Sequence, residues 1–125
     1  MTDQKFIEDV LKTENQNFEE MRSRLTDPML RILHSAIGMS TEANELLDMV
    51  KKHIFYGKEF DVTNAVEESG DILYYMAVEM DVLEKTFQEA TKKVIAKLEA
   101  RYGDKFSKER AINRDLDAER RILEK

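Results

Sequence analysis

The sequence predicts an all-α protein, and three observations support this class. Only four of the 125 residues are Gly, one is Pro and none is Trp, which leaves little material for tight hairpins. Residue types that favour helices are abundant. Apolar residues recur at steps of three and four over long stretches, as is typical of amphipathic helices. We therefore expect one domain, residues 1–125, built as a helical bundle of four main helices.

The first expected helix covers residues 2–25. Its apolar residues recur mostly at three- and four-residue steps, so they form one stripe, and we expect the helix to pack through that stripe. The residues of the stripe are Phe6, Ile7, Val10, Leu11, Phe18, Met21 and Leu25.

A second helix is expected to begin at Asp27-Pro28, because Asp27 suits the N-cap and proline is tolerated at the first helical position. Gly57 suits its C-terminal end, because glycine readily adopts the left-handed conformation found there. The helix runs toward Tyr56, and its apolar positions are Leu30, Leu33, Ile37, Leu46, Leu47 and Val50.

Residues 60–64 are expected to form a short connection to a third helix, which Asp61 or Thr63 could cap. This helix carries an apolar series and is expected to end near residues 81–84. The series consists of Val66, Ile72, Leu73, Met76, Ala77 and Met80.

A fourth helix is predicted by Thr86-Phe87-Gln88-Glu89, which fits a capping box, and Gly103 is expected to end it. After Ser107, where a short turn is expected, residues 107–125 form a charged C-terminal extension. The extension is either a docked short helix or a mobile tail.

Several of the apolar stripes are wide for so short a chain. A lone bundle of this size has a limited core, so we expect these faces to be buried against another copy of the chain. The sequence therefore predicts a homo-oligomer and leaves the choice between dimer and tetramer open.

Charge and composition narrow the classes of function. With 26 acidic and 20 basic residues the formal net charge is -6, which argues against duplex nucleic acid as a partner. No apolar run is long enough to cross a bilayer, and the first residues lack the layout of a signal peptide, so we expect a cytoplasmic protein with no membrane partner. With no cysteine and two histidines, a metal site would use mainly oxygen ligands.

Two pairs of acidic residues are the main candidates for chemistry. Glu42 and Glu45 lie on the second expected helix, and Glu68 and Asp71 lie on the third. Each pair is spaced i, i+3, so both of its side chains leave the same side of their helix. Antiparallel packing would bring all four carboxylates together, and such a cluster calls for hard divalent cations such as Mg²⁺ or Mn²⁺.

Spacing alone does not establish this site, because a chain this acidic contains about five i, i+3 acid pairs by chance. A solvated acidic face is therefore an open alternative. Both pairs lie in strongly apolar segments, which favours an inward orientation. His34 and Gly38 share the helix face of Glu42 and Glu45. Gly38 either leaves space for a ligand or permits close packing against a neighbouring helix.

Three segments then follow one another in a recognisable order. They are His34-x-x-x-Gly38-x-x-x-Glu42-x-x-Glu45-Leu46, Lys51-Lys52-His53-Ile54-Phe55-Tyr56-Gly57-Lys58, and Glu67-Glu68-x-Gly70-Asp71-Ile72-Leu73-Tyr74. Together they resemble the MazG-like nucleotide pyrophosphohydrolases of the all-α NTP pyrophosphatase superfamily, whose defining pattern is an ExxE pair followed by an ExxD pair. The resemblance covers about residues 30–106.

This resemblance implies a fold in which two-helix units of neighbouring subunits build a four-helix core, with the acids binding Mg²⁺. It implies hydrolysis of nucleoside triphosphates between the α and β phosphates, giving a monophosphate and pyrophosphate. By position, Lys97 and Arg101 correspond to a family lysine and arginine that contact phosphates. The metal ligands it implies are Glu42, Glu45, Glu68 and Asp71.

Further substrate contacts are less defined by the sequence. Gly38 and Asn64 stand where certain family members have phosphate-binding lysines. His34 and Tyr74 are expected to border the nucleoside, and Glu45 is our candidate for positioning or deprotonating the attacking water. Residues that could substitute in binding the phosphates are Lys52, Lys58, Asn113 and Arg114.

Two other metal-binding classes of protein fit the sequence less well. A di-iron carboxylate bundle is disfavoured because neither His34 nor His53 has an acidic residue three positions earlier. An EF-hand is excluded because its twelve-residue loop of oxygen ligands is absent. A non-catalytic oligomeric module that binds nucleotides or other proteins remains the alternative.

Overall fold

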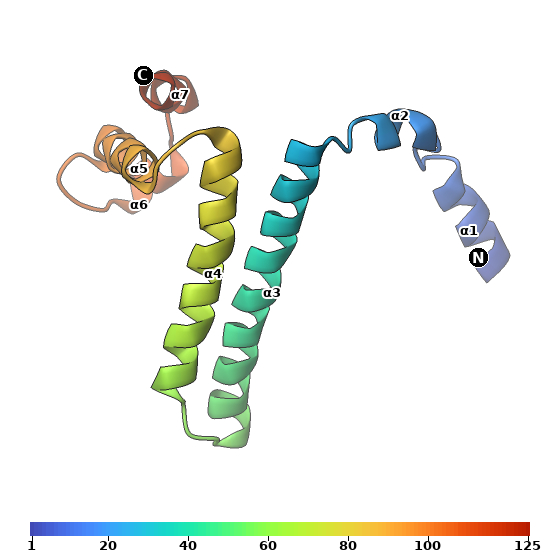
Figure 1. Cartoon of the computed structure of the whole chain (residues 1–125), viewed down its shortest axis with the longest axis horizontal. Helices are drawn as coiled ribbons and strands as arrows, with labels where there is room; N and C mark the ends of the chain where they lie inside the picture. Colours follow the sequence, from blue (N-terminus) through green and yellow to red (C-terminus); the bar gives the residue numbers. More distant parts are fainter.

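The structure is a computed structural model that describes residues 1–125. It contains seven α-helices and no strand, which confirms the predicted all-α class. The two longest helices, α3 (Asp27–Tyr56) and α4 (Val62–Leu83), lie side by side in antiparallel directions and form a hairpin (Figure 1). None of the seven helices is both long and apolar enough to span a membrane.

The other helices form two groups on opposite sides of the α3–α4 hairpin (Figure 1). The N-terminal arm consists of α1 (Asp3–Leu11) and α2 (Phe18–Ser23). The C-terminal unit consists of α5 (Phe87–Tyr102), α6 (Lys108–Ile112) and α7 (Leu116–Glu124). Extensive packing between helices occurs only between α3 and α4, and between α5 and its two neighbours α6 and α7.

The prediction of one continuous helix over residues 2–25 is wrong, because polar residues interrupt it between α1 and α2. The Thr13 hydroxyl donates to the Val10 carbonyl oxygen at 2.9 Å, and the Asn15 side chain accepts from the Asn17 backbone N–H at 3.1 Å. The Asn17 side chain in turn caps α2 by accepting from the Glu20 N–H at 3.3 Å. Such local side-chain bonds compete with the helical hydrogen bonds.

The N-termini of α3 and α4 are set by capping side chains. Thr26, not Asp27, caps α3, because its hydroxyl accepts from the Met29 N–H at 3.3 Å. The predicted cap at Asp27 is therefore wrong by one residue. At α4 the Asp61 carboxylate accepts from the Asn64 N–H at 3.1 Å, which selects Asp61 from the two candidates.

The predicted boundaries of α5 are confirmed. The Thr86 hydroxyl accepts from the Glu89 N–H at 3.1 Å, and the Glu89 carboxylate accepts from the Thr86 N–H at 2.7 Å, which completes the capping box. Gly103 ends the helix at a φ of 64°. The C-terminal extension is a docked helix, because α7 lies against α5 and the Lys93 ammonium donates to the Leu123 carbonyl oxygen at 2.8 Å.

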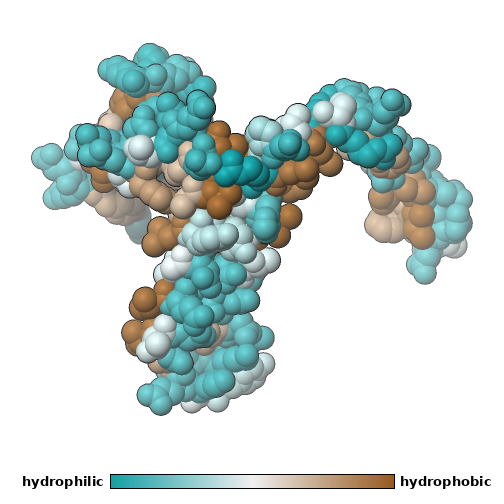
Figure 2. All heavy atoms as spheres, in the orientation of Figure 1, coloured by the Kyte–Doolittle hydropathy of each residue, from teal (hydrophilic) through white to brown (hydrophobic).

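A hydrophobic core is missing from the single chain. Only four of the 125 residues are buried, and none of them is hydrophobic: Ser35, Gly38, Glu68 and Glu119. Figure 2 shows apolar side chains at the surface of the N-terminal arm and along the hairpin. The accessible surface is 10397 Å², whereas a compact chain of 14.7 kDa exposes about 6,900 Å². About 3,500 Å² more surface is therefore exposed than a compact monomer would expose.

Gly38 allows α3 and α4 to approach closely. A Cβ atom at this position would overlap the ring of Tyr75 on α4. The same ring meets the edge of the His34 imidazole, with ring centroids 5.7 Å apart. Of the two explanations that the sequence left open for Gly38, the structure supports close packing.

Candidate metal centre

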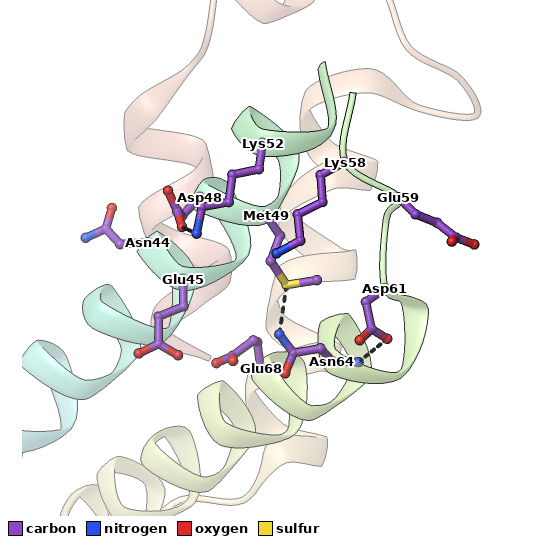
Figure 3. Close-up of a pocket in the computed structure, with 10 residues that line it drawn as sticks. All are labelled: Asn44, Glu45, Asp48, Met49, Lys52, Lys58, Glu59, Asp61, Asn64 and Glu68. Carbon is purple, nitrogen blue, oxygen red and sulfur yellow. Dashed lines mark hydrogen bonds and ion pairs between the residues drawn. The ribbon is translucent and has the colours of Figure 1, made fainter. Parts of the chain in front are cut away.

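The α3–α4 hairpin brings the two predicted acid pairs together. Glu42 and Glu45 lie on α3, and Glu68 and Asp71 lie on the facing part of α4. Oxygen atoms of Glu42, Glu68 and Asp71 all lie within 4.8 Å of one another. Glu45 is exposed, as is Asp71, and it points toward Glu68 from the opposite helix (Figure 3).

Glu68 is the most buried member of the cluster, with 7% of its surface exposed. Interactions with the carboxyl groups of Glu42 and then Glu45, followed by burial, raise the pKa of Glu68 to about 8. Its Oε2 atom is buried and has no hydrogen-bond partner. A buried carboxyl oxygen without a donor is costly, so this position requires a proton or a cation.

The donor set fits a hard divalent cation. None of the four carboxylates forms an ion pair with a lysine or arginine, so no side chain of the chain supplies the counter-charge. Three closely spaced carboxylates, one with an unpartnered oxygen, offer only oxygen ligands. Mg²⁺ and Mn²⁺ prefer such ligands, so a metal-binding triad of Glu42, Glu68 and Asp71 is chemically consistent.

A polar cleft of about 530 Å³ borders this cluster (Figure 3). It is formed by the last turns of α3, the connecting loop and the first turns of α4, and Met49 is its single apolar residue. The lining residues are Asn44, Glu45, Asp48, Met49, Lys52, Lys58, Glu59, Asp61, Asn64 and Glu68.

Two lysines give the cleft its only positive charge. The Lys52 ammonium lies 2.7 Å from Asp48, and the hydrogen bond with Asp48 raises the pKa of Lys52. Lys58 forms no ion pair, and its side chain lies at the cleft (Figure 3). Five acidic residues line the same cleft, so a phosphate group requires a bound cation to offset their repulsion.

The predicted phosphate ligands Lys97 and Arg101 lie on α5, which does not pack extensively against the hairpin. Within one chain the structure does not bring them to the acids. The Arg101 Nε atom donates to Glu119 Oε1 at 2.6 Å, and Arg114 Nη2 donates to the other carboxyl oxygen at 2.7 Å. A contact between α5 and phosphates at the acid cluster would therefore need α5 of another copy.

The predicted nucleoside contacts lie outside the cleft. His34 stands two turns before Glu42, with its ring edge toward Tyr75. Tyr74 is 64% exposed, and its ring packs edge-on against Tyr75 at a centroid distance of 5.1 Å. Both residues lie on the hairpin, and their contact with a nucleoside stays a prediction.

Sequence reasoning missed several residues of these sites. Asp48, which pairs with Lys52, follows Glu45 by three residues and could have been placed on the same helix face. Glu119 carries no comparable signal, because it is one acid among many in a charged extension. Its burial between two arginines arises from the packing of α7 on α5.

Comparisons of the chain with protein-family models, with curated proteins and with solved structures found no match.

Proposed function

We propose that the protein is a metal-dependent nucleotide pyrophosphohydrolase that acts in the cytosol. It would cleave ribo- or deoxyribonucleoside triphosphates between the α and β phosphates, giving a monophosphate and pyrophosphate. The observation that carries this proposal is the triad Glu42, Glu68 and Asp71, with its unpartnered buried oxygen, beside a cleft that presents two lysines. The resemblance of the sequence to the MazG-like enzymes supports the same reaction.

The acidic residues divide into two roles in this proposal. Glu42, Glu68 and Asp71, joined by Glu45, would hold Mg²⁺, with Mn²⁺ as a possible substitute. The chemistry supplied by a cation at these carboxylates would be to neutralise phosphate charge and lower the pKa of a coordinated water. Glu45 is exposed and stands outside the closely spaced triad, so it would be the carboxylate least engaged with the metal and would position or deprotonate the attacking water.

The lysines of the cleft would bind the polyphosphate. Lys58 has no ion-pair partner, so its ammonium is the first candidate to contact a phosphate oxygen. Lys52, which is paired with Asp48, would be the second lysine to contact the phosphates. Lys97 and Arg101 of a neighbouring copy would stabilise charge on the leaving pyrophosphate, because a lysine point charge and an arginine fork both suit phosphate oxygens.

We also propose that the functional unit is a homo-oligomer, either a dimer or a tetramer. The chain exposes about 3,500 Å² more surface than a compact monomer, which is ample surface for a permanent interface. A hairpin with an uncovered apolar face is self-complementary under two-fold symmetry, because two such hairpins form a four-helix bundle.

The proposal is tested by incubating the purified protein with a panel of nucleoside triphosphates, with and without Mg²⁺. Equal amounts of monophosphate and pyrophosphate, formed only with Mg²⁺, would support it. Stepwise release of phosphate would contradict the assigned reaction. Nucleotide binding without turnover would favour the non-catalytic binding module.

A further inference from the structure

The N-terminal arm presents an apolar helix face that no other helix of the chain covers. On α1, the residues Phe6, Ile7, Val10 and Leu11 form one stripe, and each is between 48% and 59% exposed. Neither α1 nor α2 packs extensively against another helix. Because an isolated helix of nine residues is unstable in water, α1 needs a surface against which to fold.

A groove of about 520 Å³ between α5 and α7 offers such a surface. Four lysines border it, and Ala96 and Ile122 provide apolar contacts. Glu89 is the only acid in the lining, and its carboxylate already accepts from the Thr86 N–H in the capping box. The four lysines are Lys85, Lys92, Lys93 and Lys125.

The charges of the arm and of the groove are complementary. Residues 1–23, which contain the arm, hold six acidic residues, two lysines and one arginine. Both of these lysines, Lys5 and Lys12, are paired with Asp9. Asp3 forms no ion pair and lies on the same face of α1 as Phe6 and Val10, because the three residues are spaced i, i+3 and i+7. The apolar stripe of α1 is thus accompanied by a free carboxylate, which suits a basic groove.

We propose that α1 of one copy docks in the α5–α7 groove of a second copy. In Figure 1 the arm and the C-terminal unit lie on opposite sides of the hairpin, so the arm of the same chain points away from its own groove. In a two-fold pair, each copy supplies one arm and one groove, so the α1 stripe and the α5–α7 groove of both copies become covered. This docking adds to the contact between hairpins and does not depend on the reaction proposed above.

The surface area of the chain supports an exchange of arms. About 3,500 Å² per chain is exposed beyond the expectation for a compact monomer, whereas a standard interface buries about 800 Å² on each partner. The excess therefore leaves room for a second contact beside the one between hairpins. Docking of the arm covers a separate apolar surface with the same partner.

The absence of cysteine allows a direct test by disulfide trapping. Three full-length variants pair Ala96→Cys with Phe6→Cys, Ile7→Cys or Val10→Cys, so that every disulfide formed is a designed one. The matched control pairs Ala96→Cys with Lys5→Cys, which lies on the opposite face of α1. Each variant is oxidised at neutral pH, its helix content is checked by circular dichroism, and the linked peptides are identified by mass spectrometry.

The expected result is a covalent dimer of twice the 14.7 kDa chain mass, joined between α1 and position 96. At least one stripe variant should give about tenfold more of this dimer than the control, because disulfide formation requires close Cα atoms. A disulfide within one chain would overturn the proposal, because the arm would then dock on its own groove. Folded variants without any link between α1 and position 96 would overturn it as well. Neither result depends on nucleotide hydrolysis.

Discussion

Glu42 and Glu68 face each other across the α3–α4 interface, with carboxyl oxygens within 4.8 Å and no lysine or arginine paired with either. Two carboxylates at this distance repel each other unless a proton or a cation lies between them. The carboxyl groups of Glu42 and Glu45 raise the pKa of Glu68 to about 8, and the Oε2 atom of Glu68 has no hydrogen-bond partner. A divalent cation bound between these carboxylates would offset their repulsion and displace the proton from Glu68.

Replacing the buried carboxylate should remove the response to Mg²⁺. In the native protein, Mg²⁺ at a hundredfold excess over its Kd contributes about 2.7 kcal/mol, which raises the thermal midpoint by about 10 °C. Glu68→Gln should abolish this shift, whereas Glu67→Gln, at the exposed neighbouring position, should retain it. Differential scanning fluorimetry with EDTA or Mg²⁺ makes the comparison, and an unchanged shift in Glu68→Gln would contradict the metal assignment.

Replacing either of two glycines on the hairpin by alanine should change the stability of the protein, and the two changes should have opposite signs. At Gly38 a Cβ would overlap the Tyr75 ring, so Gly38→Ala should destabilise the protein by about 1–3 kcal/mol. At Gly70 a Cβ would meet nothing within 4 Å, so Gly70→Ala should stabilise helix α4 by about 0.5–1 kcal/mol. Urea unfolding curves provide both values. Equal effects of the two substitutions would show that the approach of α3 and α4 at Gly38 is not tight.

The docking of α7 should depend on the charge of Glu119. Hydrogen bonds from Arg101 and then Arg114 lower the pKa of Glu119 to about 2, below its usual value of 4.5. Because the folded state holds this proton less tightly than the unfolded chain, the contribution of Glu119 is fully present above pH 4.5 and is lost as the pH falls toward 2. NMR of α7 amides over this pH range should follow its release.

A substitution separates this effect from the general acid response of the protein. Glu119→Gln should release α7 already at neutral pH and lower the hydrogen-exchange protection of its amides. Glu124→Gln is the matched control, because Glu124 forms an exposed i, i+4 pair with Arg120, and such pairs contribute little. Equal protection of α7 in both variants would mean that the Arg101–Glu119 pair does not hold α7 on α5.

The oligomeric state can be measured on the native protein, without any substitution. Sedimentation equilibrium should give a mass that is a small multiple of 14.7 kDa, because the lone chain buries no hydrophobic residue. A compact folded monomer at micromolar concentration would contradict the homo-oligomer.

Much of the fold could be predicted from local sequence signals. Thr86 with Glu89, Asp61 and Gly57 mark helix ends because capping bonds form between neighbours in the chain. The interruption between α1 and α2 was missed because the apolar stripe continues beyond it, while the local bonds of Asn15 and Asn17 turn the chain. The periodicity of apolar residues indicates which face of a helix is apolar, but it does not indicate where the helix ends.

The candidate site, too, could be predicted from the sequence only in part. The i, i+3 spacing of the two acid pairs became a site only through the antiparallel packing of α3 and α4, which brings Glu42, Glu68 and Asp71 together. The spacing alone did not separate this cluster from a solvated acidic face. The environment of Arg101 could not be predicted, because Glu119 reaches it only after the chain has turned back through α6. Contacts between segments that are far apart in the chain produce no recognisable spacing of residues in the sequence.

The most direct test of the metal centre is the rate of pyrophosphate release by variants of its acids. Glu45→Gln and Asp71→Asn should keep their helix content and lose about a hundredfold or more of the Mg²⁺-dependent rate, whereas Glu67→Gln should match the native protein. Full activity in a folded Glu45→Gln or Asp71→Asn protein would contradict the assignment of these carboxylates.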